Sequence, residues 1–306
     1  MRFWKWLLAM LVVYLAVSAG AGFLLCDMAV HPGRKPLNAA AQSKAEGLAA
    51  KYQASLEEAA ILQRDGAICK AWYFRNLQGR HRGAALVLHG LSDNRSGMMG
   101  YIDLFLANGY SVLAPDSRMH GESGGSLATY GLLERQDVFL WLDWIHEKEP
   151  DEPVFALGES MGAAILLQSL EAGAQFRAVV SEASFSNFRE MGCDRISQKL
   201  HLPLSVGRYL FLPAVEFGFF RGMQKYHLDL RRVAPEGVCA VSSVPILMIH
   251  SRADQNIPFR HALRIHEACG NRIEFWPVSD GGHASTLGKH RAEFTSRVLQ
   301  FFERHR

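Results

Sequence analysis

The chain has 306 residues, of which 49% are hydrophobic, and this length allows one large α/β domain or two small ones with a sizeable core. The formal net charge is only +3 at pH 7 and the basic residues are scattered, which gives no case for a nucleic-acid-binding protein. The five cysteines show no C-x-x-C spacing, so neither a zinc site nor a redox motif is indicated. A disulfide between Cys239 and Cys269 is one pairing that the sequence leaves open.

The N-terminal segment 1–29 predicts a membrane anchor or signal segment. Arg2 and Lys5 precede an uncharged run from Trp6 to Cys26, which as a helix spans roughly 30 Å, the thickness of a bilayer core. An uncleaved signal anchor fits this length best, and its two basic residues favour a cytoplasmic N-terminus with the rest of the chain outside the cytoplasm, in the periplasm or on the cell surface. Two alternatives stay open: a signal peptide cleaved near Val17-Ser18-Ala19, and a lipoprotein signal at the cysteine that ends the run.

After a linker and a helix within residues 30–66, strand-like and helix-like segments alternate. The helix is expected over residues 39–60. The predicted strands are short apolar or β-rich runs, at 67–75, 84–89, 110–114, 153–157, 176–181, 245–250 and 272–278. The further predicted helices are 97–107, 132–147, 163–170, 258–269 and 289–302. This alternation predicts an α/β fold with a mostly parallel, doubly wound sheet in a domain that covers residues 67–306.

One segment, at about 186–241, interrupts the alternation. It separates two predicted strands and is far longer than a crossover helix requires. Its aromatic side chains include Phe188, Tyr209, Phe211, Phe217, Phe219, Phe220 and Tyr226. We interpret the segment as a helical cap that covers the active site and lines an apolar pocket, because long insertions between core elements tend to be functional lids. Ordinary core packing is the alternative.

The stretch Gly158-Glu159-Ser160-Met161-Gly162 follows the pattern G-x-S-x-G between a predicted strand and a predicted helix. This strand–turn–helix setting is typical of a nucleophile elbow. The turn is so tight that a side chain at either glycine is expected to collide with the neighbouring strand or helix. Such a turn lifts the serine hydroxyl above the sheet and aims the N–H groups of the following helix at a developing oxyanion.

A serine hydroxyl becomes a nucleophile when a base lies in reach and a carboxylate orients that base. In this architecture the two partners follow the serine in the order Asp or Glu, then His. Asp254 lies in the loop after the predicted strand 245–250, and His283 follows Gly281-Gly282 after the last predicted strand. We therefore predict Ser160 as nucleophile, His283 as base and Asp254 as the orienting carboxylate. Asp280 is the alternative carboxylate, although its closeness to His283 in the sequence favours a role within the loop.

The oxyanion hole requires two backbone N–H groups, one after the nucleophile and one from the loop after an early strand. Met161 supplies the first position. Leu91 is the predicted second donor, because Gly90 allows the chain to turn sharply at the end of the predicted strand 84–89. His89 is expected to orient this loop through its ring rather than to transfer protons. An ordinary glycine turn is the alternative.

Taken together, these motifs resemble the α/β-hydrolase superfamily over residues 67–302. The matching segments, in chain order, are His89-Gly90, Asp116 to Gly124, Gly158 to Gly162, Asp254 and Gly282-His283. The second segment resembles the D-x-R-G-H-G-x-S block of serine-aminopeptidase-like members, with Met119 in place of the usual glycine. In those relatives this block is a structural loop near the active site. The likeness extends to membrane-anchored, extracytoplasmic bacterial hydrolases, and it implies acyl hydrolysis without fixing a substrate.

The prediction for function is a membrane-tethered serine hydrolase that cleaves carboxylic esters. The aromatic insertion favours an apolar acyl or alcohol group on a small-molecule substrate. Serine peptidases, thioesterases and acyltransferases use the same triad and remain alternatives, as does a non-catalytic binding protein on a hydrolase scaffold. The chemistry of the triad requires no metal or organic cofactor. The other predicted partner is the membrane, through the N-terminal helix, and no nucleic acid is expected.

Overall fold

The computed structural model describes residues 2–78 and 81–306. These described residues divide into two compact units. The smaller unit joins the N-terminal helix, up to His31, to the segment Asn187–Ala234. The larger unit comprises Pro32–Ser186 and Pro235–Arg306, so the insertion 187–234 lies outside the unit that carries the predicted catalytic residues.

Within the described residues, the larger unit is built on an eight-stranded sheet with the order β1-β2-β4-β3-β5-β6-β7-β8. In chain order the strands are β1 (Ala54–Leu62), β2 (Ile68–Asn76), β3 (Ala84–Leu88), β4 (Ser111–Pro115), β5 (Val154–Glu159), β6 (Val179–Glu182), β7 (Ile246–Ser251) and β8 (Ile273–Val278). β2 pairs antiparallel with both β1 and β4. The pairs from β4 through β8 are parallel, which confirms the predicted mostly parallel sheet.

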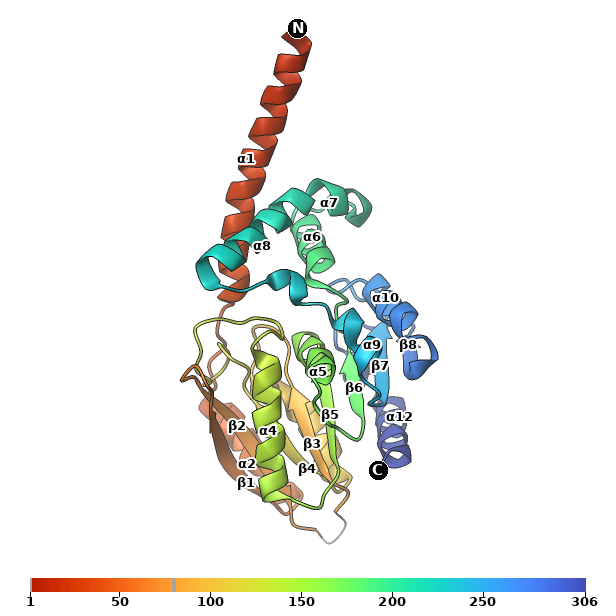
Figure 1. The fold of residues 1–306 in the computed structure, drawn as a ribbon. Helices are drawn as coiled ribbons and strands as arrows, with labels where there is room; N and C mark the ends of the chain where they lie inside the picture. The colour runs from red at the N-terminus through yellow and green to blue at the C-terminus, as the bar shows by residue number, and fades with distance from the viewer. Residues whose placement is uncertain (1, 79–80) are drawn as a thin grey trace. The chain divides into compact units, whose positions relative to one another are not determined.

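Helices cover both faces of this sheet. α2 (Ala39–Lys51), α3 (Met99–Ala107) and α12 (Arg291–Arg304) share one core cluster with inward side chains of the strands, among them Phe155 and Val180. Side chains alternate along a strand, so the intervening positions face the opposite layer. Figure 1 shows α4 (Glu134–Lys148) and α5 (Met161–Glu171) in front of the sheet. The remaining α-helices among the described residues of this unit are α9 (Val238–Val241), α10 (Arg260–Cys269) and α11 (Thr286–Lys289).

One predicted element was wrong in part. The sequence predicted a single helix over residues 39–60, but α2 ends at Lys51 and residues 54–62 form β1. Gln53 has a positive φ of 50° at the break. Ala, Leu and Glu favour helices locally, yet β1 pairs with β2 along its whole length, and this long-range pairing overrides the local preference. The sheet therefore begins ahead of residue 67, where the sequence placed the domain start.

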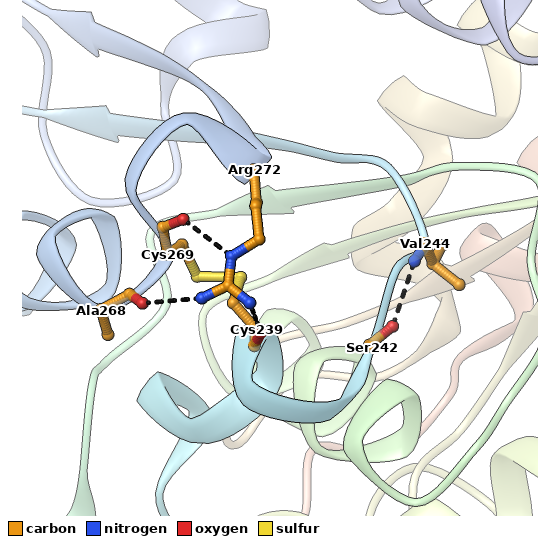
Figure 2. Close-up of a disulfide and its surroundings, with 6 residues drawn as sticks. All are labelled: Cys239, Ser242, Val244, Ala268, Cys269 and Arg272. Carbon is orange, nitrogen blue, oxygen red and sulfur yellow. Dashed lines mark hydrogen bonds between the residues drawn. A yellow bond between two sulfur atoms is a disulfide. The ribbon is translucent and has the colours of Figure 1, made fainter.

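A disulfide joins Cys239, in the short helix α9, to Cys269 at the end of α10. Figure 2 shows Arg272 beside this bond. Its guanidinium donates hydrogen bonds to the backbone oxygens of Cys239, Cys269 and Ala268. The carbonyls in the last turn of a helix have no partner within the helix, so Arg272 caps α10 while it ties α9 to it. The pairing that the sequence left open is thus the one found in the structure.

Removal of this disulfide is expected to destabilise the larger unit. The two cysteines are separated by 30 residues, and loop-closure entropy for such a loop corresponds to about 3–4 kcal/mol. A variant with Cys239→Ser and Cys269→Ser should therefore unfold several degrees lower in a thermal scan followed by circular dichroism. Reductant should lower the midpoint of the unmodified protein to that of the variant and leave the variant unchanged. Equal midpoints for both proteins without reductant would contradict this expectation.

The smaller unit contains the long N-terminal helix α1 (Arg2–Val30), together with α6 (Phe188–Lys199), α7 (Leu204–Leu210) and α8 (Leu212–Tyr226). The most apolar 18-residue window of α1 has a mean hydropathy of 2.3, and α1 is long enough to cross a membrane. These properties confirm the predicted N-terminal apolar helix, and they fit a membrane anchor and a signal sequence equally. α8 packs directly against α1, as Figure 1 shows.

The insertion predicted at about 186–241 is helical, as the sequence indicated. Its first part, Asn187–Ala234, belongs to the smaller unit, whereas the segment from Pro235 to Val241 belongs to the larger unit and carries Cys239. The proposed role of the insertion as a cap over the active site stays a prediction.

Candidate active site

Ser160 stands at the sharp turn between β5 and α5, with φ 54° and ψ −114°. Positive φ is strained for a residue with a Cβ atom, and such strain gathers at functional sites. A Cβ atom on Gly158 would lie 2.5 Å from the carbonyl carbon of Gly162, and one on Gly162 would lie 2.3 Å from the oxygen of Leu88. The first clash is with the start of α5 and the second with the end of β3. Both glycines of the motif are therefore required by close packing, as the sequence predicted.

The structure brings the three predicted catalytic side chains together. His283 Nε2 lies 2.7 Å from Ser160 Oγ, and His283 Nδ1 lies 2.8 Å from Asp254 Oδ2. An ionised carboxylate only accepts hydrogen bonds, so the ring proton sits on Nδ1 and Nε2 accepts from the serine hydroxyl. This tautomer is the one in which a histidine can take a proton from serine.

The carboxylate of Asp254 is held on both sides. Its Oδ1 accepts hydrogen bonds from the backbone N–H groups of Asn256 and Ile257, at 2.8 and 2.9 Å. Burial alone would raise the pKa of Asp254, but the hydrogen bond and charge of His283, together with the backbone hydrogen bond from Ile257 and the charge of His250, outweigh burial and hold that pKa below its ordinary value. The side chain is thus an ionised, oriented partner for the histidine at neutral pH.

Asp280, the alternative carboxylate, is placed elsewhere. Its side chain is exposed and bonds to His290 at 2.7 Å and to Lys289 at 3.4 Å. These contacts tie the loop after β8 to the segment that precedes α12. The geometry therefore favours Asp254 as the partner of His283.

The predicted oxyanion donors lie on the two segments that flank the nucleophile. Met161 is the first residue of α5, and the first N–H groups of a helix have no partner within it. A Cβ atom on Gly90 would lie 3.5 Å from Ser160 Cβ, so the chain that leads to Leu91 passes beside the serine. The assignment of the Leu91 and Met161 N–H groups to an oxyanion hole remains a prediction.

His89 is buried at the end of β3 and acts on this loop through hydrogen bonds. Nδ1 donates to the carbonyl of Gly90 at 2.7 Å, and Nε2 accepts from the N–H of Ser117 at 3.0 Å. Burial, with the charge of nearby His120, lowers the pKa of His89 to about 4. The ring is therefore neutral and fixes the loop, in agreement with the expectation from the sequence.

The D-x-R-x-H-G-x-S block forms a structural loop. Asp116 accepts hydrogen bonds from the guanidinium and the backbone N–H of Arg95, at 2.6 and 2.7 Å. Arg118 donates two hydrogen bonds, of 2.7 and 2.6 Å, to the carboxylate of Asp137 on α4. Buried, bidentate pairs of this kind fix a loop firmly. The block holds the segment between β4 and α4 in place, which is the role that the resemblance implied.

Sequence reasoning missed a pair of carboxyl groups at the elbow, the partly buried Glu159 and the buried Glu182. Tyr101 Oη lies 3.2 Å from Glu159 and 2.9 Å from Glu182. Burial raises the pKa of both glutamates, and Glu182 raises that of Glu159 further. The other oxygen of Glu182 accepts the N–H of Thr286 at 3.0 Å, so Glu182 holds the loop that carries His283. The signal was a glutamate at the carboxyl end of the strand next to the elbow strand.

Metal-ligating side chains are not gathered at this site. In residues 2–78 and 81–306, no group of three or more His, Cys, Asp or Glu side chains is arranged to hold a metal ion. The titratable groups around Ser160 are instead engaged with one another and with the backbone, as described above.

The sequence of this chain is similar to a peptidase family and to a lipase. The family model described as "Serine aminopeptidase, S33" matches residues 79–206. The uncharacterized protein YqkD of Bacillus subtilis (strain 168) is 29% identical over 223 residues, which cover 71% of this chain and 70% of that protein. Lysophosphatidylserine lipase ABHD12 of Danio rerio is 27% identical over 242 residues, which cover 74% of this chain but only 58% of the lipase.

Solved structures share the fold. An esterase of Pyrococcus furiosus, Pf2001, superposes with a TM-score of 0.70 at 21% sequence identity, and the match covers 90% of this chain and 98% of the esterase. An α/β hydrolase of Penicillium, GrgF, gives a TM-score of 0.62 at 18% identity and covers 82% of this chain. Identities this low establish a common architecture only.

Proposed function

This chain belongs to the α/β-hydrolase superfamily and is a hydrolase, and on that premise we propose that it is a membrane-tethered serine esterase for apolar acyl substrates. The observation that carries the proposal is the hydrogen-bonded line from Ser160 through His283 to Asp254 at the nucleophile elbow. Geometry of this kind, rather than fold, decides function in a superfamily with many activities.

The reaction follows from the positions of the three side chains. As Ser160 Oγ attacks the ester carbonyl, His283 Nε2 takes its proton, and Asp254 stabilises the resulting imidazolium. The N–H groups of Leu91 and Met161 stabilise the oxyanion of the tetrahedral intermediate. His283 then protonates the leaving alcohol. Water, deprotonated by the same histidine, attacks the acyl-enzyme and releases the acid, which restores the serine hydroxyl.

The choice of an ester rests on the names of two similar proteins, a lysophosphatidylserine lipase and an esterase. The expectation of an apolar acyl group comes from the aromatic residues of the insertion, whose role as a cap stays a prediction. The family model is named for a peptidase, which makes peptide hydrolysis the alternative to test.

We also propose that α1 anchors the protein and that the larger unit lies on the extracytoplasmic side. Arg2 and Lys5 precede the apolar run, and basic residues favour the cytoplasmic side of a membrane helix. The disulfide between Cys239 and Cys269 lies in the larger unit, and disulfides persist in oxidising compartments outside the cytosol. Both features favour the same orientation.

The test is hydrolysis of nitrophenyl esters from acetyl to dodecanoyl by the full chain in detergent, beside aminoacyl nitroanilides. We expect turnover of the esters that rises with acyl length. A serine-directed phosphonate should label Ser160, and prior labelling should abolish turnover. Hydrolysis of the anilides alone would replace the esterase proposal with peptidase activity. A folded protein that neither turns over substrates nor reacts with the phosphonate would contradict the assignment of the triad.

A further inference from the structure

The helices α7 and α8 expose an unusual number of large apolar side chains. Tyr209 is 75% exposed, Phe220 51% and Val206 50%. On the same two helices Leu210, Leu212 and Met223 also have more than a third of their surface exposed, as do Leu200 and Leu202 in the segment that precedes α7. Apolar patches of this extent on a protein surface mark sites that contact another protein or a membrane.

The contacts between α8 and α1 show which parts of the two helices lie together. Tyr14 on α1 donates a hydrogen bond to the carbonyl oxygen of Leu210, which ends α7 just before α8 begins, and further along both helices Phe23 stacks on Phe220. Between these contacts the backbones nearly touch, because a Cβ atom on Gly22 would lie 2.2 Å from the oxygen of Ala214. Later positions on α1 thus meet later positions on α8, so the two helices run in the same direction. Small residues at the crossing are typical of helix pairs in membranes.

This register fixes the depth of α7 once α1 spans a bilayer. Tyr14 lies about 18 Å along the helix axis from Cys26, the end of the apolar run, at 1.5 Å per residue. A bilayer core is roughly 30 Å thick, so Tyr14 lies near its middle. The carbonyl of Leu210, at the end of α7, is 2.6 Å from the hydroxyl of Tyr14 and therefore lies at a similar depth.

Hydrogen bonding at this depth is suited to lipid. The last carbonyls of a helix have no helical partner, and an unpaired backbone group in the hydrocarbon region costs several kcal/mol. Tyr14 supplies the missing donor to Leu210. Between Lys199 and Glu216 the only Lys, Arg, Asp or Glu is Arg208, whose long side chain can reach toward the interface while its stem stays in an apolar environment.

Charged side chains gather where α1 leaves the apolar run. The carboxylate of Asp27 accepts hydrogen bonds from Arg221 and Lys225 at 3.2 Å and from the hydroxyl of Tyr226 at 2.8 Å. Basic and tyrosine side chains of this kind are enriched at the membrane–water interface. The first half of α8 therefore lies beside the apolar part of α1, and its last turn lies at the polar end.

We propose that α7 and the first turn of α8 are immersed in the bilayer beside α1, with phospholipid acyl chains covering Val206, Tyr209 and Leu212. This inference rests on the membrane anchoring by α1 proposed above. It makes the insertion a second membrane-embedded part of the chain, in addition to the anchor itself.

The test is a depth measurement on the full chain in vesicles of phosphatidylethanolamine and phosphatidylglycerol. A nitroxide is attached at Tyr209→Cys on α7, at Val13→Cys on α1 and at Leu62→Cys on β1, three positions that are 75%, 62% and 69% exposed. The native cysteines are buried or disulfide-bonded, so background labelling is measured on the unmodified chain and subtracted. Labelling of Ser160 by a serine-directed phosphonate checks that each variant is folded.

Collision rates of the nitroxide with oxygen, which concentrates in lipid, and with a nickel chelate, which stays in water, give the depth. We expect the oxygen-to-nickel ratio at positions 209 and 13 to be several-fold higher than at position 62. A ratio at 209 equal to that at 62, with 13 still in lipid, overturns the proposal and leaves the anchor intact. Low collision with both reagents at 209 also overturns it, since a protein partner then covers α7. Water exposure at position 13 refutes the anchor and the immersion together.

Discussion

Ser160→Ala is expected to lower kcat for ester hydrolysis by about four to six orders of magnitude and to leave the fold intact. The hydroxyl is the only group removed, and its oxygen lies 2.7 Å from His283 Nε2. Without it no acyl-enzyme forms, and the remaining rate comes from binding and the oxyanion hole alone. A loss of this size corresponds to about 5–8 kcal/mol of transition-state stabilisation.

Stability should change little in this variant, for reasons the elbow makes clear. Alanine keeps the Cβ atom, so the strain of the positive φ at Ser160 is the same in both proteins. The packing that forces glycine at positions 158 and 162 does not involve the hydroxyl. The free energies of unfolding of Ser160→Ala and of the unmodified protein, measured by thermal unfolding, should therefore agree within about 1 kcal/mol. Ser55→Ala on the exposed face of β1 is the matched control and should retain full activity. If kcat of Ser160→Ala were within tenfold of that of the unmodified enzyme, Ser160 would not be the nucleophile.

The parts of this protein that the sequence predicted well are those governed by local rules. Short apolar runs predicted the parallel strands. Parallel strands bring their carboxyl ends to one edge of the sheet, so the strand ends also indicated where Asp254 and His283 lie, while the catalytic roles of these residues stay a proposal. Gly158 and Gly162 marked the elbow because close approach of two backbones admits no other residue.

The parts that failed depend on contacts between distant segments. Residues 54–62 have helical composition, and only their pairing with β2 makes them a strand. Glu182 was overlooked because its importance comes from Tyr101 and Thr286, far away in the sequence. Gly22 on α1 packs against α8, and these two helices are also far apart in the sequence. Neither helix has a sequence pattern that identifies the other as its partner.

Asp254→Asn is expected to lower kcat by about four orders of magnitude, with little effect on KM. The backbone explains why an amide is so poor a substitute here. The N–H groups of Asn256 and Ile257 both point at Oδ1, so the carbonyl oxygen of the asparagine takes that place. Its NH2 group then faces His283 Nδ1, which must act as an acceptor. The proton moves to Nε2, where the ring can no longer accept one from Ser160.

Asp280→Asn is the matched control, because it makes the same chemical change a few residues from His283. Asp280 is exposed and bonds only to Lys289 and His290 among the contacts that the structure describes, so its loss should change kcat less than threefold. Initial rates with one ester across neutral pH, measured for both variants and the unmodified enzyme, decide the matter. If Asp280→Asn lost activity and Asp254→Asn kept it, Asp280 would be the carboxylate of the triad. Since the two backbone donors lock the amide, raising the substrate concentration should not restore the Asp254→Asn variant.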